Sequence, residues 1–148
     1  MTTAPSAGAG RIVVGHDGSA SSLAALSWAA RQAALTGSTL EIVMTWEWPP
    51  SFGWAVPVPD DFDPGSDVEH ALDGVVAQVL ADHPGLQVNP RVISGHPAPV
   101  LVEASKGAEL LVVGSRGHGE FVGMLIGSVS AYCVTNAHSP VLVHRPIG

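Results

Sequence analysis

The sequence predicts an α/β fold in which helices sandwich an open five-stranded parallel sheet. Short apolar runs rich in Val, Ile and Leu alternate along the chain with longer segments of helical pattern. Continuous apolar runs are typical of strands that are buried on both faces, as in a parallel sheet. Strands that alternate with helices also imply βαβ units with right-handed crossovers, which place helices on both faces of the sheet.

The first third of the chain predicts two strands with a helix between them. The apolar run RIVVG at residues 11–15 is followed by the turn residues HDGS, so it predicts the first strand. The Ala- and Leu-rich segment 19–36 predicts the first helix: it opens on Ser and Asp candidates for the N-cap, among them Ser19, and stops at Gly37, a natural C-terminal cap. The apolar run 38–46 predicts the second strand.

A long irregular segment separates the second strand from the second helix. From Trp46 to Asp67 the chain contains five prolines and three tryptophans, which exclude a regular element. A segment of this kind either acts as a lid over a ligand or partner, or covers the edge of the core, and the sequence leaves both readings open. Apolar residues then recur on one face at helical spacing and predict the second helix: Val68, Leu72, Val75, Val76, Val79 and Leu80.

The last part of the chain predicts three more strands and two helices. Residues 86–94 predict a third strand, and Pro90 favours a sheet edge because proline donates no ladder hydrogen bond. A short helix at 97–106 precedes the most strongly apolar strand, at 108–115. A final helix at 128–137 and a closing strand at 139–145 complete the pattern.

Length and composition limit the class of protein. A chain of 148 residues suffices for one domain with its own core, which we assign to residues 11–148, with residues 1–10 as a disordered lead-in that lacks signal-peptide features. The single cysteine, Cys133, cannot form an internal disulfide, and no apolar run is long enough to span a membrane, so we expect a cytoplasmic protein. A net charge of −7 argues against nucleic-acid and anionic-membrane partners.

The strands at 11–15 and 108–115 are the ones expected to flank a ligand. In open parallel sheets, ligands bind beyond the carboxyl ends of the strands at the point where the strand order reverses. The first of these strands is followed by HDGS and the second by the glycine-rich segment GSRGHGEFVGMLIGS at 114–128. We therefore expect a binding cleft between these two segments.

The glycine-rich segment predicts a phosphate cradle. It leads from a strand into a helix, so backbone N–H groups and the helix dipole can face an anion without side chains in the way. Ser128 and Ser130 can add hydroxyl donors, and Arg116 is the only cation in the segment. Taken alone, the glycines also allow a mobile turn that binds nothing.

The spacing of the glycines is more specific than their number. Gly-x2-Gly-x9-Gly-Ser, together with VVGHDGS at 13–19 and SGHPAPVLVEAS at 94–105, resembles the universal stress protein family over residues 11–145, and in particular its ATP-binding, single-domain members. The resemblance implies the Rossmann-like, adenine nucleotide alpha hydrolase-like version of the fold. It also implies a set of nucleotide contacts: Asp17 to the nucleoside, the backbone of Thr45 to the adenine, Val113 and Gly114 to the ribose, and Gly117, Gly127, Ser128, Val129 and Ser130 to the phosphates.

The implied function is that of a nucleotide-dependent sensor or regulator in the stress response. Family membership also implies a homodimer through the last strand, from Pro140 to Arg145. The resemblance leaves open whether ATP, AMP or cyclic AMP is preferred and whether Mg²⁺ or Mn²⁺ accompanies it. A weak ATPase or phosphotransferase is one alternative, although Lys106 lies outside any glycine loop. A nucleotide-free protein-interaction module is the other.

Two residues depart from the family pattern. His16 stands directly before Asp17, and Glu120 adds a negative charge to the glycine loop. His16, His96 and His118 all lie near predicted strand ends, where they would either make nucleotide affinity depend on pH or be ordinary solvated loop residues. We expect no protein metal site, because the seven histidines show no ligand spacing.

Overall fold

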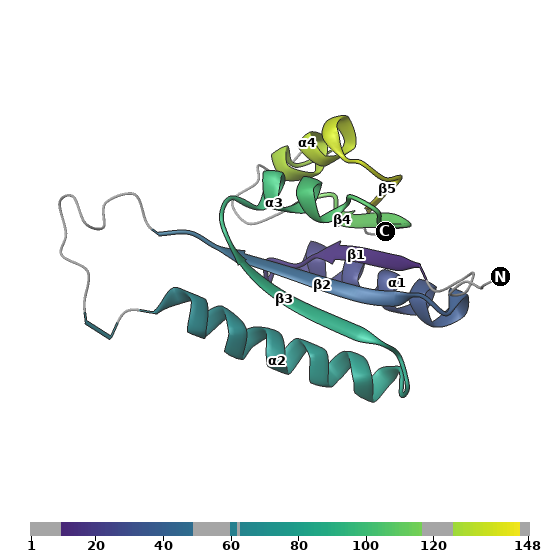
Figure 1. Cartoon of the computed structure of the whole chain (residues 1–148), viewed down its shortest axis with the longest axis horizontal. Coiled ribbons are helices and arrows are strands. Elements are labelled where there is room, and N and C mark those ends of the chain that lie inside the picture. Colours follow the sequence, from purple (N-terminus) through teal and green to yellow (C-terminus); the bar gives the residue numbers. More distant parts are fainter. Residues whose placement is uncertain (1–9, 49–59, 62, 117–125, 146–148) are drawn as a thin grey trace.

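The computed structural model describes residues 10–48, 60–61, 63–116 and 126–145. Within them, five parallel strands form one sheet in the order β3-β2-β1-β4-β5, which confirms the predicted architecture (Figure 1). The strands are β1 Arg11–Gly15, β2 Thr39–Trp46, β3 Val88–Ser94, β4 Leu110–Gly114 and β5 Val141–His144. The helices are α1 Ala20–Thr36, α2 Pro64–Asp82, α3 Pro97–Ala104 and α4 Ser128–Asn136.

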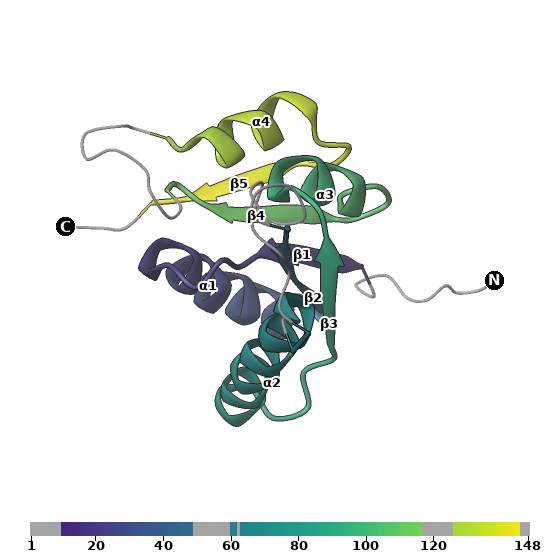
Figure 2. The same ribbon diagram turned by 90° about the vertical axis from the view of Figure 1, so that its left-hand side faces the viewer.

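Helices cover both faces of the sheet. Helices α1 and α2 lie on one face and α3 and α4 on the other, as both views show (Figures 1 and 2). Each strand alternates its side chains between the two faces, so Ile12 and Val14 join the core beneath α1 and α2 while Val13 joins the core beneath α3 and α4. The central strands therefore contribute to two apolar clusters, which explains why their sequences are apolar at every position.

The strand order reverses between β1 and β4. From β1 the chain builds outward through β2 to β3 and then crosses back to start β4 and β5 on the other side. The chain continues from β1 into α1 on one face of the sheet and from β4 into α4 on the other face, so the segments that follow these two neighbouring strands diverge. The predicted position of the ligand cleft is thus the topological switch point of the sheet.

The ends of the helices follow the predicted caps, with one correction. Ser19 caps α1, since its Oγ accepts a hydrogen bond from the Ser22 N–H, and Gly37 ends the helix in the left-handed conformation with a φ of 73°. Helix α2 begins at Pro64, three residues before the predicted end of the irregular segment at Asp67, because Asp63 caps it and proline is favoured in a first turn. Residues 49–59 of that segment lie outside the described part.

The edges of the sheet also agree with the sequence. Strand β3 is one edge, where Pro90 sits opposite Ile42 of β2. Strand β5 is the other edge, and its four residues are all only half-buried. In the described part of the chain, no helix has the length and apolarity needed to cross a membrane.

Candidate functional site

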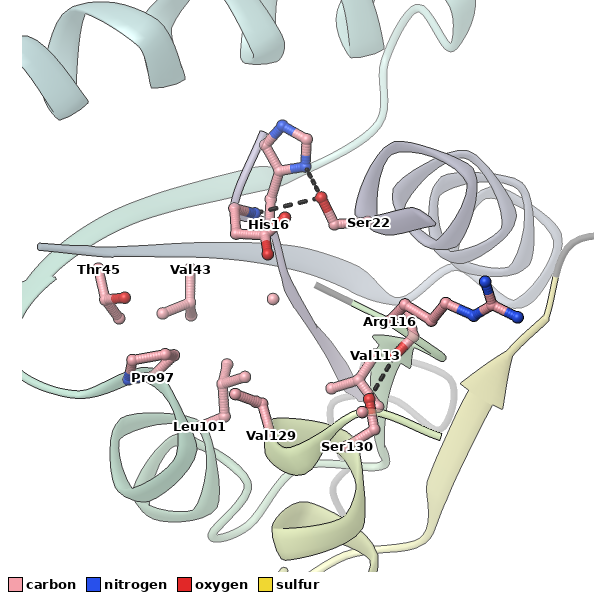
Figure 3. Close-up of a pocket in the computed structure, with 14 residues that line it drawn as sticks. His16, Ser22, Val43, Thr45, Pro97, Leu101, Val113, Arg116, Val129 and Ser130 are labelled. Atoms are coloured by element: carbon pink, nitrogen blue, oxygen red, sulfur yellow. Dashed lines mark hydrogen bonds between the residues drawn. The ribbon is translucent and has the colours of Figure 1, made fainter. Parts of the chain in front are cut away.

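A cleft lies at the carboxyl ends of β1 and β4, between the start of α1 and the start of α4 (Figure 3). Eight of the ten residues implied by the sequence line it, in agreement with the expected position of the site. These eight are Asp17, Thr45, Val113, Gly114, Arg116, Gly127, Val129 and Ser130.

Of the two remaining predicted residues, one is outside the lining of the cleft and the other is outside the described residues. Ser128 is the first residue of α4 and its side chain is exposed, outside the set of lining residues. Gly117 lies outside the described residues, as do His118 and Glu120. The contacts implied for the middle of the glycine loop therefore remain predictions.

Six further residues complete the lining: sequence reasoning missed five of them, whereas it had placed the sixth, His16, near a strand end. Val43 lies two positions before Thr45 and so shares its face of β2, which period-two alternation could have indicated. Pro97 and Leu101 of α3 form an apolar wall that only the packing of α3 beside the strand ends places here (Figure 3). The others are Gly15, His16 and Ser22.

On the side of the cleft formed by β1 and α1, polar groups of the chain are hydrogen-bonded to one another. The Asp17 side chain accepts a hydrogen bond from the Ser19 N–H at 2.9 Å, and Ser19 in turn caps the helix. The Ser22 hydroxyl lies 3.2 Å from the Asp17 N–H, which donates to it, and 2.9 Å from Nδ1 of His16. In the first turn of α1 the Ser22 amide thus has a side-chain partner, and the Asp17 carboxylate stands just before the helix.

His16 is buried rather than solvated, which corrects the loop reading for this histidine. Only 8% of the residue is exposed, and its ring turns toward Ser22 and away from Leu101 and Val129 (Figure 3). Burial lowers the pKa of His16 below its ordinary value of 6.5, against the opposing effect of the Asp17 charge. His96, by contrast, is exposed, and its Nδ1 lies 3.4 Å from Oε2 of Glu47, close to the start of the irregular segment.

The backbone of Thr45 is directed toward the cleft. The carbonyl of Val43 accepts a hydrogen bond from the His16 N–H, so the polar groups of Val43 face β1. Backbone groups two residues apart in a strand point to the same side, and β1 has ended at Gly15, opposite Val43. The N–H and C=O of Thr45 therefore face the open space beyond the end of β1.

Gly114 is a glycine because of packing, not only because of the cleft. A Cβ at this position would lie 2.6 Å from Oγ of Ser21 and 2.9 Å from the Ser21 carbonyl carbon and oxygen. The first turn of α1 thus presses directly on the end of β4. Ser21 also accepts a hydrogen bond from the Arg116 N–H at 3.3 Å, which ties the start of the glycine loop to α1.

The start of α4 differs from the start of α1. Its N-cap is Gly127, which has no side chain to accept from the first-turn amides. The Gly127 N–H donates to the Ser115 carbonyl at 2.6 Å, which closes the glycine loop at its base. The Ser130 hydroxyl donates to the Gly114 carbonyl, so this side chain joins α4 to β4.

Charged groups at the cleft are few. The Arg116 guanidinium is exposed and points away from Thr45 and Leu101, so in this conformation only its backbone and the base of its side chain border the cleft (Figure 3). Among the residues that the structure describes, no group of three or more His, Cys, Asp or Glu side chains could hold a metal ion.

Comparison with known proteins gives consistent relatives. A family model described as "Universal stress protein family" matches residues 8–145. A universal stress protein of Mycolicibacterium smegmatis is 36% identical over 91% of this chain and 45% of its own length, and one of Mycobacterium tuberculosis is 34% identical over 90% and 47%. The chain therefore spans about half the length of the curated relatives it matches.

Solved structures show the same fold over full-length chains. A universal stress protein in complex with cAMP has a TM-score of 0.67 and 29% identity, covering 90% of this chain and 94% of its own. UspA from Lactobacillus plantarum has a TM-score of 0.74 at 21% identity, covering 93% and 98%, which supports the fold alone. The sheet order, the cleft at its switch point and the family match over residues 8–145 lead to one conclusion: this chain belongs to the universal stress protein family.

Proposed function

We propose that this chain binds an adenine nucleotide, ATP in the first instance, in the cleft between β1 and β4. The observation that carries the proposal is the contrast between the two helices that start at the cleft. Helix α1 is capped by Ser19 and has the Asp17 carboxylate beside it, whereas α4 starts at Gly127 without a side-chain cap. An anionic ligand is attracted to the positive end of a helix, and a glycine N-cap adds no side chain that would compete for this position.

This contrast also supports one orientation of the nucleotide. A carboxylate repels phosphates but accepts hydrogen bonds from ribose hydroxyls, so the sugar would lie beside Asp17 and the phosphates at the start of α4. The adenine would then lie against the backbone of Thr45, with Val43, Leu101 and Val129 as apolar surroundings. In this arrangement Ser130 would contribute its backbone amide, because its hydroxyl is bonded to Gly114.

The solved relatives support an adenine base. One relative was crystallised with cAMP and another, from Arabidopsis thaliana, with AMP. These ligands and ATP share adenosine and a 5′-phosphate, and for the base the cleft offers backbone groups and apolar side chains rather than a charged pair. The preference for a triphosphate depends on the glycine loop, including Gly117 and Glu120, and is part of the proposal.

We further propose that nucleotide binding regulates the association of the chain. A ligand that binds only one arrangement of the glycine loop stabilises that arrangement by linkage. The half-buried edge strand β5 offers the stretch from Pro140 to Arg145 as the surface of a homodimer. Since β4 ends at the cleft and pairs directly with β5, a change at Gly114 on ligand binding can reach the proposed dimer surface.

The test is calorimetric titration of the purified chain with ATP, AMP and cAMP, with mass spectrometry of any nucleotide released on denaturation. Gly127 has a φ of −75°, which any residue can adopt, so Gly127→Val adds a side chain at the cleft without backbone strain. We expect this variant to keep its circular dichroism spectrum and lose ATP binding. Unchanged affinity in Gly127→Val would refute the proposed position of the phosphates.

Other outcomes of the same experiment favour the alternatives. ATP turnover that is lost in Asp17→Ala but kept in an exposed surface variant such as Arg31→Gln would favour a weak ATPase. No released nucleotide, together with no rise in the melting temperature on addition of ATP, would favour a nucleotide-free interaction module.

A further inference from the structure

A second cavity lies on the α3 and α4 face of the sheet, toward the amino ends of the strands and away from the nucleotide cleft. It is bounded by β1, β2 and β3 below and by the end of α3 above. Its polar lining consists of Arg11, Glu41, Arg91, Glu103 and Lys106. None of these residues belongs to the nucleotide cleft.

The composition of this cavity is unusual for the chain. The whole sequence has only six basic residues and a net charge of −7, yet three of the six line this one cavity: Arg11, Arg91 and Lys106. Two carboxylates, Glu41 and Glu103, accompany them. Three cations against two carboxylates leave one positive charge in excess, in a protein whose surface is otherwise acidic.

Glu41 is the buried centre of the cluster. It stands on β2 with its side chain only 4% exposed, and Val43, two positions later on the same face, belongs to an apolar cluster. Its carboxylate accepts from Nη1 of Arg91 at 2.9 Å, from Nδ2 of Asn89 at 3.3 Å and from Nη1 of Arg11 at 3.4 Å. A buried ionic network of this kind contributes little to stability compared with apolar residues of similar volume, so stability alone does not explain it.

The two arginines of the network, Arg11 and Arg91, differ in their hydrogen-bond partners. Arg11 donates to the carbonyls of Ala104 at 2.9 Å and Lys106 at 2.7 Å, so its guanidinium is occupied by the C-terminal end of α3. Arg91 is 43% exposed, and its contact with Glu41 uses Nη1. A guanidinium has five N–H donors in a rigid fork. Glu41 thus occupies one nitrogen of Arg91, which also lines the cavity, and among the described residues no hydrogen bond engages Nη2 or Nε.

We propose that this cavity is a binding site for a small oxyanion, a phosphate or a carboxylate group, held by Arg91 and Lys106. The fork of Arg91 matches two oxygens of either group, and such charge-assisted pairs are the stronger kind of hydrogen bond. Lys106, which pairs with the exposed Glu103 at 3.1 Å, is the second cation at the mouth and can turn toward the ligand. The anion balances the excess positive charge that Glu41 leaves on the cluster.

The experiment is an NMR titration of the full ¹⁵N-labelled chain with inorganic phosphate, and separately with acetate, each at constant ionic strength set with chloride. We expect saturable shifts of the Arg91 Nε–H signal and of the backbone amides of Ile93 and Lys106. The amides of Val129 and Ser130 report the nucleotide cleft separately, so phosphate that binds only there is recognised. Saturation by phosphate alone identifies a phosphate site, and saturation by both anions a general oxyanion site.

Variants make the assignment specific. Arg91→Gln removes the fork and is expected to weaken anion binding at least roughly tenfold, as judged from the Ile93 and Lys106 amides. Lys106→Gln leaves the contacts of Glu41 intact, so it folds normally and weakens binding about threefold, the size expected for one exposed charge. Arg31→Gln, on α1, is the matched control and keeps wild-type affinity. Absence of saturable shifts in the wild type, or equal affinity in both test variants and wild type, overturns the proposal.

Discussion

Replacing Gly114 by alanine tests whether the end of β4 is glycine because of packing. The added Cβ would meet backbone as well as side-chain atoms, at 2.9 Å from the carbonyl carbon and oxygen of Ser21 and 2.6 Å from its Oγ. The Ser21 hydroxyl can rotate away, but the backbone belongs to the first turn of α1 and moves only with the helix. Gly114 itself is held by pairing with His144 of β5.

The size of the effect follows from this geometry. Relief of the contact requires a shift of α1 by several tenths of an ångström against a tightly packed core, and overpacking of this kind costs about 1–3 kcal/mol. For a chain of this length, a loss of about 2 kcal/mol lowers the melting temperature by roughly 4–8 °C. The variant should also weaken nucleotide binding, since α1 and the glycine loop are linked through Ser21 and Arg116.

Urea unfolding and thermal melting of Gly114→Ala provide the measurement, with Gly74→Ala as the matched control. Gly74 lies within α2, and a Cβ there would meet no atom within 4 Å. Alanine is favoured over glycine inside a helix by about 1 kcal/mol, so the control should be more stable than wild type. If Gly114→Ala is as stable as wild type, or if both substitutions shift stability in the same direction, the packing argument is wrong.

Three further predictions concern single residues. Ser19→Ala removes the cap of α1 and should lower the free energy of unfolding by about 1 kcal/mol in urea titrations; an unchanged value would contradict the capping role. The pKa of His16 is lowered in the folded state, so below pH 6.5 the unfolded chain binds more protons than the folded chain. The contribution of His16 to stability is therefore full above pH 6.5 and is lost as the pH falls through the pKa of the folded state. His16→Asn should lessen this loss of stability in acid, and a pH profile identical to that of the wild type would exclude His16 as its source. Burial raises the pKa of the Cys133 thiol from 9.0 to about 11, so the free energy of unfolding should fall as the pH rises between these two values. At pH 8 the thiol should react with a disulfide reagent far more slowly in the native chain than in the urea-unfolded chain, and equal rates would show that Cys133 is accessible.

The cleft at β1 and β4, where we propose that a nucleotide binds, and the second cavity lie on the same face of the sheet but differ in their lining. In the cleft, Val43 and Thr45 of β2 face apolar residues of α3 and α4, and polarity comes from backbone groups. Two positions earlier on the same strand, Glu41 carries a charge that two arginines surround. One strand therefore presents an apolar surface toward its carboxyl end and an ionic one toward its amino end, which suits a base and an anion respectively.

The order of elements and the position of the cleft were predictable from local signals in the sequence. Apolar runs, the caps Ser19 and Gly37, and Pro90 at an edge depend on neighbours within a few residues, and each was found where expected. In an open parallel sheet a ligand binds where the order of the strands reverses, and the segments that follow residues 15 and 114 were the ones predicted to lie at this point. These inferences needed only periodicity, capping chemistry and the handedness of crossovers.

Other features depend on contacts between residues far apart in the chain, which no local pattern encodes. His16 resembles a turn residue in sequence, but the packing of α1 buries it and lowers its pKa. Ser130 was predicted to hold phosphates with its hydroxyl, yet the approach of α4 to β4 directs that hydroxyl to Gly114. The cluster around Glu41 joins residues 30 and 50 positions apart. The sequence by itself determined the fold, the family resemblance and the edge of the sheet that carries the cleft. Only the tertiary structure decided which polar groups are already bonded within the chain and which remain for a ligand, because partners distant in sequence satisfy them.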